Sequence, residues 1–259
     1  MFRQNIFVLI LVIAASTSVI AADIVEFKGT DTTKEGTSLM LRDKLIKPQG
    51  KGSFPAIVML HGCAGINYGR DKQWADRLAS WGYVAFQIDS LGPRGYSNIC
   101  DAHQLYAQRV RDAYDGKSYL NELPFVDRKR ISVLGWSHGG WTTLAVIDQK
   151  RDDPFRSAIA FYPYCGQVSI WRGLSNFNAP LLILIGEKDD WTHANLCSRR
   201  MRSGQTGPEV ILKIYPDAYH DFDSEGLDGY LLGHRLLYNP AALDDAIVQV
   251  KEFLAKHLK

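Results

Sequence analysis

Residues 131–142 have the sequence ISVLGWSHGGWT, which carries the strongest indication of the fold. The apolar run Ile131–Leu134 predicts a buried strand, and a helical pattern begins at Gly139. Between them lies a G-x-S-x-G motif centred on Ser137. A serine on a sharp turn from strand to helix is typical of a nucleophile elbow, in which the hydroxyl projects beyond the edge of the sheet. We therefore expect Ser137 to be a nucleophile at a helix N-terminus, where the helix dipole favours developing negative charge.

Further apolar runs on both sides of this motif predict the rest of a sheet. They lie at 56–60, 84–88, 158–161, 181–185 and 210–214, with a loosely alternating outer strand at 37–47. Runs without alternation are typical of strands covered on both faces. Helical patterns lie between them at 74–81, 105–120 and 140–147, and a last helix follows Asn239 as N-cap. Strands that alternate with helices indicate one doubly wound α/β domain, with helices on both faces of a mostly parallel sheet.

A serine nucleophile needs a base, and the base needs an acid that orients it. His220 follows the last apolar run, and Asp189 and Asp190 follow the run before it. Because parallel strands end at one edge of the sheet, these loops and Ser137 should share that edge. The order serine, acid, histidine is a known order of a catalytic triad. We expect His220 to accept the serine proton and Asp189 to orient the imidazole, with Asp190 as the alternative acid.

An oxyanion formed at Ser137 needs two N–H donors about 3 Å away. The residue after the nucleophile, His138, is expected to supply one backbone N–H. The loop HGCAG at 61–65 follows an earlier strand, and we expect the backbone N–H of Cys63 to be the second donor.

The sequence implies no cofactor and no metal. His193 and Cys197 are spaced to share a helix face, but two ligands do not make a zinc site, and there is no C-x-x-C spacing. Gly116-Lys117-Ser118 lacks the first glycine of a phosphate loop, because Arg111 stands in its place.

These segments together resemble the dienelactone hydrolase family of the α/β-hydrolase superfamily. The similar segments are HGCAG at 61–65, Asp89-Ser90 with Arg94-Gly95, GWSHGG at 135–140, GEKDDW at 186–191, and Tyr215-Pro216 with HDF at 220–222. The resemblance implies a single α/β-hydrolase domain without a large cap, acting on small esters or lactones. It further implies that Arg94 holds a substrate carboxylate, with a loop-bracing role as the alternative. The archetypal members of the family use cysteine as the nucleophile and are cytoplasmic. This chain has Ser137 instead, and it begins with a leader segment.

The N-terminal segment 1–22 has the order of a secretory signal peptide. A short positive start is followed by an apolar run at 6–15 and by small residues before Asp23. The alternative is an uncleaved anchor, although ten apolar residues fall short of the roughly 20 that span a bilayer. We therefore expect a signal peptide at 1–22, a hydrolase domain at 23–259, and a periplasmic or secreted protein.

Four cysteines suit an exported protein, because disulfides persist outside the cytoplasm. Four cysteines allow three pairings. The resemblance favours Cys63 with Cys100 and Cys165 with Cys197.

The net charge of this chain limits the kinds of partner that it can bind. Its 259 residues carry 30 Lys and Arg against 28 Asp and Glu, a net charge of +2, without a basic block. We therefore expect no nucleic-acid partner, no membrane partner after leader removal, and a monomer or small homo-oligomer.

The function predicted is that of a serine hydrolase that cleaves a small-molecule ester or lactone through an acyl-enzyme on Ser137. A peptidase or acyltransferase with the same triad is one alternative, since only the acyl acceptor or leaving group differs. A non-catalytic envelope-associated binding protein of the same fold is another. The segment 221–238 is expected either to cover the pocket as a lid or to pack as a surface loop.

Overall fold

The computed structural model of this chain describes residues 22–33, 35–101, 106–166, 177–201 and 207–258. In that part, eight strands form one sheet in the order β1-β2-β4-β3-β5-β6-β7-β8. Strands β1 and β2 are antiparallel to their neighbours, and all pairings from β4 to β8 are parallel. The predicted mostly parallel sheet is therefore confirmed, with an antiparallel pair at one edge.

The strands of the sheet have the following bounds: β1 (Ala22–Thr32), β2 (Ser38–Ile46), β3 (Phe54–Leu60), β4 (Val84–Ile88), β5 (Val126–Trp136), β6 (Ala158–Phe161), β7 (Leu181–Gly186) and β8 (Val210–Tyr215). A separate hairpin consists of β9 (Asp228–Leu231) and β10 (His234–Leu237). The helices are α1 (Arg70–Ser80), the 3-10 turn η1 (Gly92–Arg94), α2 (Tyr106–Glu122), α3 (His138–Asp148), α4 (Ala194–Met201) and α5 (Pro240–His257).

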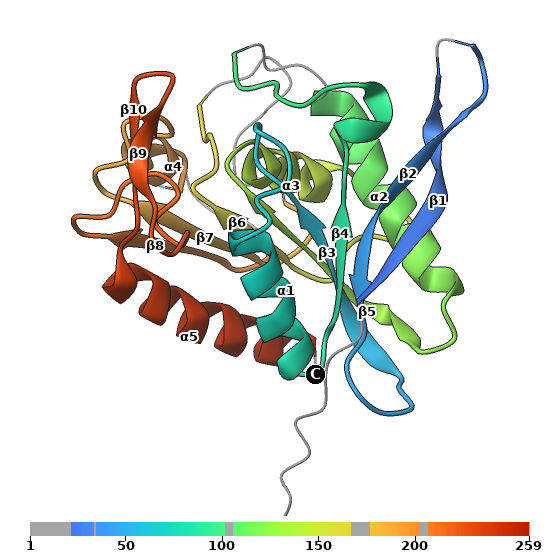
Figure 1. The fold of residues 1–259 in the computed structure, drawn as a ribbon. Coiled ribbons are helices and arrows are strands. Elements are labelled where there is room, and N and C mark those ends of the chain that lie inside the picture. Colours follow the sequence, from blue (N-terminus) through green and yellow to red (C-terminus); the bar gives the residue numbers. More distant parts are fainter. Residues whose placement is uncertain (1–21, 34, 102–105, 167–176, 202–206, 259) are drawn as a thin grey trace, which may run out of the picture.

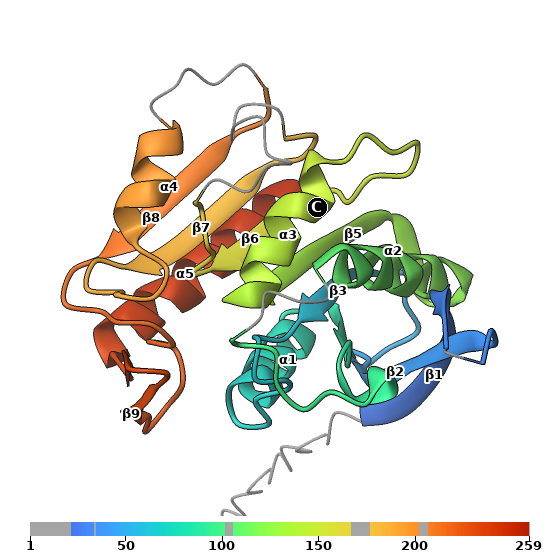
Figure 2. The same cartoon turned by 90° about the horizontal axis from the view of Figure 1, so that it is seen from above.

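Helices cover both faces of the sheet. Helices α1 and α5 lie on one face, and α2, α3 and α4 lie on the other (Figures 1 and 2). The last helix starts as its sequence predicts, because the Asn239 side chain accepts a hydrogen bond from the Ala242 N–H at 3.0 Å and Pro240 follows it. The single doubly wound domain predicted from the sequence is confirmed.

The hydrophobic core lies along the central strands. All six residues of β7 and the last five of β3 are buried, which explains why these runs show no alternation. Large aromatic side chains fill the space between sheet and helices; Trp74 of α1 lies edge-on to Phe161 of β6, with ring centroids 5.0 Å apart.

Some elements differ from the sequence-based expectation. Strand β1 is not predicted by the sequence, because its apolar signal is weak: Phe27 is the one buried position, and Ile24 is exposed. Strand β5 starts at Val126, five residues before the apolar run; residues 127–130 are exposed or half-buried, so they carry no apolar signal. The segment 221–238 contains the β9–β10 hairpin, which lies above the start of α5, at the upper left of Figure 1.

The two expected disulfides, Cys63–Cys100 and Cys165–Cys197, are present. Their pairing is therefore confirmed. The expected signal peptide falls almost entirely outside the described residues. Among the residues that are described, no helix is long and apolar enough to cross a membrane.

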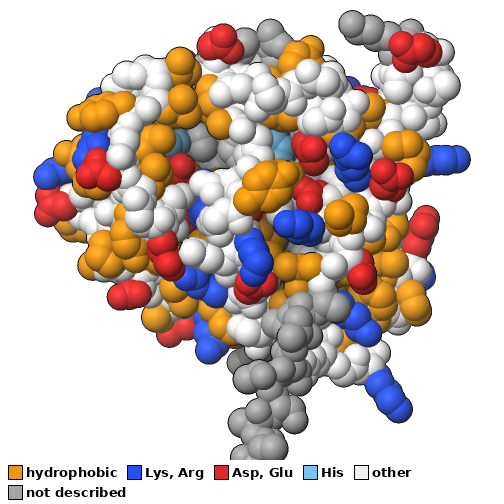
Figure 3. Space-filling view, in the orientation of Figure 1, with side chains coloured by type: hydrophobic (Ala, Val, Ile, Leu, Met, Phe, Trp, Pro, Cys, Tyr) orange, Lys and Arg blue, Asp and Glu red, His pale blue; other side chains and the backbone are white. Residues whose placement is uncertain are grey.

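Charges of both signs are interspersed on the face of the molecule that carries α1. Lysine and arginine side chains alternate there with aspartate and glutamate among apolar patches (Figure 3).

Candidate active site

Ser137 lies on the turn between β5 and α3, in a backbone conformation that few non-glycine residues adopt. Its φ and ψ are 51° and −114°. Two close approaches enforce this turn: a Cβ at Gly135 would collide with the carbonyl of Gly139, and one at Gly139 would collide with the carbonyl of Leu60. The Ser137 N–H donates to the carbonyl of Phe161 at 3.0 Å. The predicted strand–turn–helix elbow is therefore present, and it holds the serine at the N-terminus of α3.

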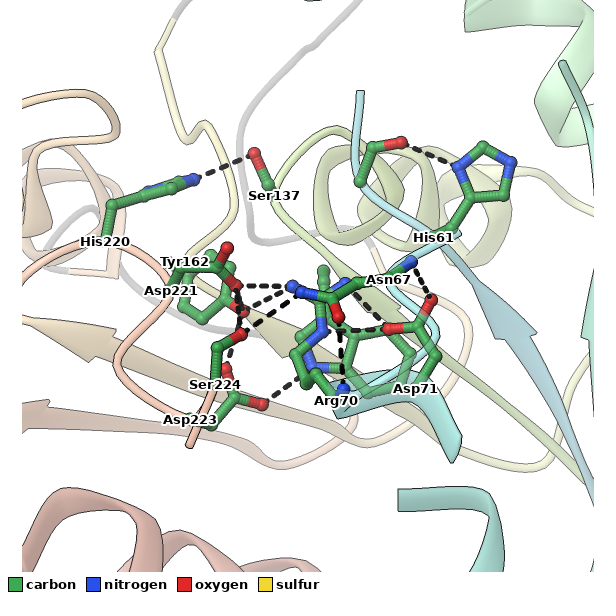
Figure 4. A network of polar contacts seen from close by, with 12 residues as sticks. His61, Asn67, Arg70, Asp71, Ser137, Tyr162, His220, Asp221, Asp223 and Ser224 are labelled. Carbon is green, nitrogen blue, oxygen red and sulfur yellow. Dashed lines mark hydrogen bonds and ion pairs between the residues drawn. The ribbon is translucent and has the colours of Figure 1, made fainter. Parts of the chain in front are cut away.

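His220 lies in the loop after β8 and faces Ser137 across the edge of the sheet. Its Nε2 is 3.0 Å from the Ser137 Oγ (Figure 4). Its Nδ1 is 2.7 Å from the Asp189 Oδ2. Both His220 and Asp189 are buried, at 3% and 2% exposure, so bulk water does not compete for these contacts. The structure thus brings together the serine, histidine and aspartate that the sequence singles out.

Asp189, not Asp190, faces the imidazole. Its carboxylate also accepts hydrogen bonds from the Trp191 N–H, at 3.0 Å, and from the N–H and hydroxyl of Thr192, at 2.8 and 2.9 Å. Burial alone would raise the pKa of Asp189, but His220 and Thr192 outweigh it and hold that pKa below its usual value. Asp190 is exposed and lies 3.5 Å from His234. The alternative acid is therefore separated from His220.

The loop after β3 contains Cys63, the second expected oxyanion donor. Cys63 and His138 both line a cavity of about 200 Å³ beside Ser137. The loop is tied down at two points, because the Cys63 carbonyl accepts from the Ile99 N–H at 2.9 Å and its sulfur is bonded to Cys100. The two residues expected to donate N–H groups therefore line the same cavity as the serine.

His61 precedes this loop and is completely buried. Its Nε2 accepts the Ser90 N–H at 3.2 Å, and its Nδ1 lies 2.6 Å from the Gly62 carbonyl. Burial, together with the nearby charge of Arg109, lowers the pKa of His61 well below its usual value. His61 is therefore neutral and braces the turn, and it does not compete with His220 as the base.

Arg109 of α2 belongs to this site and was missed by the sequence reasoning. It is fully buried, and one guanidinium nitrogen lies 2.7 Å from the His138 Nδ1 while another donates to the His61 carbonyl. Burial lowers its pKa to about 10. Arg109 lies four residues before Ala113 and seven before Gly116, so it shares the core-facing side of α2 with them. A charged residue on the buried side of a helix indicates a buried partner, and this spacing could have identified Arg109 from the sequence.

A second group of polar side chains lies beneath the triad (Figure 4). The Arg70 guanidinium, at the start of α1, pairs with Asp71 at 2.7 Å and also donates to the Asp221 carboxylate and to the Tyr162 hydroxyl. Burial opposes ionisation of Asp221, but Arg70 and His220 hold its pKa below the usual value. Because Asp221 directly follows His220, the ion pair with Arg70 anchors the histidine loop to α1.

Asp223 completes this group from the same loop. One carboxylate oxygen accepts from the indole N–H groups of Trp74 and Trp136, at 2.8 and 2.9 Å. The other lies 2.6 Å from the Tyr162 hydroxyl, which is also 2.8 Å from Asp221. Burial raises the pKa of Asp223, while Arg70 and the hydrogen bonds from Tyr162 and Trp136 oppose that increase. Asp223 therefore ties the histidine loop to α1 through Trp74 and to β5 through Trp136.

Arg94 does not join the site. Its guanidinium donates to both oxygens of Asp112, at 2.8 and 2.7 Å, to Asp31 at 2.7 Å and to the Ser90 carbonyl at 2.8 Å. It lines a different cavity from Ser137, on the side of β1. The expectation that Arg94 holds a substrate carboxylate is corrected by this arrangement, because a substrate would have to displace Asp112. The alternative, a loop-bracing arginine, matches these contacts.

Two cavities flank Ser137. The first, of about 270 Å³, includes His220, and the second is the cavity of about 200 Å³ lined by Cys63 and His138. Leu231 and Leu236 of the β9–β10 hairpin line the first cavity, so the segment 221–238 forms a wall of the pocket. Ser137 with His220 and Asp189 behind it can accept an acyl group from a small substrate that binds in these cavities.

This chain is similar to known proteins in its sequence and in its fold. A family model described as the dienelactone hydrolase family matches residues 41–258. A Bradyrhizobium protein that carries the name 2-oxo-3-(5-oxofuran-2-ylidene)propanoate lactonase is 28% identical over 206 residues, which cover 72% of this chain and 80% of that protein. An uncharacterized peptidase of Bacillus subtilis (strain 168) is 25% identical over 240 residues, 75% of this chain but only 35% of the peptidase.

A solved structure shows the same fold. The dienelactone hydrolase-like promiscuous phosphotriesterase P91 from metagenomic libraries superimposes with a TM-score of 0.71 at 20% identity, over 92% of this chain and 100% of that one.

Proposed function

The chain belongs to the dienelactone hydrolase family, and from this premise we propose that it is a serine hydrolase acting on small carboxylic esters or lactones. Ser137 Oγ attacks the acyl carbon as its proton passes to His220 Nε2. That proton then passes to the leaving alkoxide, and the C–O bond to the alcohol breaks. Water, deprotonated by His220, attacks the acyl-enzyme and releases the acid, and Ser137 regains its proton.

The observation that carries this proposal is the relay of 3.0 Å from Ser137 to His220 and 2.7 Å from His220 to Asp189. These are hydrogen-bond distances in a buried site, as proton transfer requires. The low pKa of Asp189 keeps the carboxylate ionised, so it can stabilise the imidazolium that forms.

The backbone N–H groups of Cys63 and His138 are proposed as the oxyanion donors. Support comes from their place in the lining of one cavity together with Ser137. The N-terminus of α3 adds the favourable end of a helix dipole at this point.

An ester or lactone is favoured over a peptide as the substrate. The chain aligns with most of the length of the lactonase relative but with about a third of the peptidase relative. A peptide or an acyl acceptor other than water would use the same steps, so substrates that differ only in the leaving group separate these functions.

The test compares wild type with Ser137→Ala on p-nitrophenyl acetate, a simple lactone and the matching anilide. We expect Ser137→Ala to lower kcat by about 10,000-fold or more on the ester and lactone, with the circular dichroism spectrum unchanged. Ser80→Ala, which removes an exposed serine at the end of α1, serves as the matched control. Equal turnover by Ser137→Ala and wild type would reject the proposal, and faster turnover of the anilide would favour the peptidase.

We also propose that the protein is exported, with residues 1–22 as the signal peptide and 23–259 as the mature domain. Two disulfides support an oxidising compartment, periplasmic or extracellular. The intact mass of the protein made by a secreting host should show a start at Ala22 or Asp23 and no free thiol. A full-length mass would contradict cleavage.

A further inference from the structure

The two cavities beside Ser137 differ in what lines them. Both include Cys63, Ser137 and Trp191. The cavity of about 270 Å³ adds His220 and is lined in part by polar side chains, including Asn67, Arg70 and Asp221. The cavity of about 200 Å³ adds His138 and two aromatic side chains, Trp141 and Tyr164. We call these the histidine cavity and the aromatic cavity.

The chemistry of acyl transfer assigns one part of a substrate to each cavity. The leaving oxygen must approach His220 Nε2, because that atom returns the proton. The oxyanion must point to the N–H groups of Cys63 and His138. The remaining substituent on the tetrahedral carbon, the acyl group, is then directed away from His220.

We propose, resting on the serine-hydrolase function above, that the histidine cavity takes the alcohol portion and the aromatic cavity takes a small aromatic acyl group such as benzoyl. The histidine cavity contains His220, and the described lining of the aromatic cavity does not.

The aromatic side chains that line the aromatic cavity pack against other rings. Trp141 stacks on Tyr106, with ring centroids 4.1 Å apart, and Tyr164 lies perpendicular to Trp141 at 87°. Trp191 stacks on His234 at 4.9 Å. Rigid rings of this kind offer a planar guest both face and edge contacts without losing side-chain freedom.

The volume of the aromatic cavity and the charge of its lining favour a neutral aromatic acyl group. A cavity of roughly 150 Å³ lined by apolar residues holds benzene, so about 200 Å³ accommodates a single ring. The described residues lining this cavity include no Lys, Arg, Asp or Glu. Arg109 holds the His138 Nδ1 as an acceptor, so that imidazole is neutral. A neutral aromatic acyl group therefore fits better than a carboxylate-bearing one.

The experiment measures kcat/KM for p-nitrophenyl benzoate and p-nitrophenyl acetate, which share one leaving group. Tyr164→Ala should lower the benzoate-to-acetate ratio roughly tenfold relative to wild type, because it removes an aromatic wall. The difference in intrinsic reactivity of the two esters cancels when variant and wild-type ratios are compared. Tyr164→Phe should restore the wild-type ratio, since the ring and not the hydroxyl makes the contact.

Leu231→Ala is the matched variant in the histidine cavity. It should change the ranking of acetate esters that differ in their alcohol, and it should leave the benzoate-to-acetate ratio at the wild-type value. If Tyr164→Ala instead changes the alcohol ranking and not the acyl ratio, the assignment of the cavities is wrong. If the turnover does not depend on Ser137 at all, the proposed function itself has failed. Melting temperatures of the variants identify any loss that comes from misfolding.

Discussion

At the scale of single residues, the site depends on which neighbour faces each titratable group. Asp189 and Asp190 are adjacent in sequence, yet one is buried against His220 and the other is exposed beside His234. The difference arises because Asp189 accepts three further hydrogen bonds from Trp191 and Thr192, which fix its side chain inward.

This difference predicts opposite outcomes for two conservative substitutions. Asp189→Asn should lower kcat by roughly 1,000- to 10,000-fold, because an amide no longer favours the imidazole tautomer that accepts the serine proton. Asp190→Asn should leave kcat within about threefold of wild type, as expected of an exposed side chain away from the relay. Steady-state kinetics on a nitrophenyl ester measure both, and similar losses in the two variants would contradict the assignment of Asp189.

At the scale of elements, the site depends on how closely α3 approaches the end of β3. Gly139 lies in the first turn of α3 with its Cα against the Leu60 carbonyl, which leaves no room for a side chain. This contact places the Ser137 turn next to the loop of Cys63, so the same packing that builds the core also builds the proposed oxyanion site.

Gly139→Ala should therefore destabilise the fold by about 2–4 kcal/mol and lower activity in the fraction that remains folded. Gly229→Ala in β9 is the matched control, because a Cβ there meets no atom within 4 Å. Urea unfolding of both variants gives the comparison. If Gly139→Ala were as stable as Gly229→Ala, the close approach of α3 to β3 would be wrong.

At the scale of the whole molecule, stability depends on pH through carboxyl groups that folding buries. Asp43 on β2 is half-buried, and burial raises its pKa to about 6, with a further increase from the charge of Asp89. Because this pKa is higher in the folded state than the usual 3.8, its contribution to stability is full below about pH 4 and is lost as the pH rises through about 6.

Asp43→Asn should therefore be more stable than wild type by about 1–2 kcal/mol near pH 8, a figure reduced for partial exposure, with the difference vanishing near pH 4. Chemical unfolding at several pH values measures this difference. Asp244→Asn, on the exposed side of α5, controls for the change in net charge. A gain that is the same at every pH would contradict the raised pKa of Asp43.

The sequence alone determined the elements whose residues carry a local signal. The apolar runs predicted β3, β4, β6, β7 and β8, and Asn239 with Pro240 marked the start of α5. The G-x-S-x-G motif and the residues that end the strands indicated Ser137, His220 and the pair Asp189 and Asp190. The predicted strands are confirmed, because the burial of a strand and the geometry of a turn depend mainly on neighbouring residues. The catalytic roles of the indicated residues stay a prediction.

The other features of the site depend on contacts between distant segments, so they follow from the packing of the folded chain. This packing separated Asp189 from Asp190, directed Arg94 to Asp112 and brought Arg109 to His138 from another helix. It also divided the space around Ser137 into two cavities whose walls come from loops more than sixty residues apart, such as Cys63 and Trp191. The spacing of apolar residues along the sequence does not predict the partner of a buried charged side chain, because that partner depends on how the sheet and the helices pack.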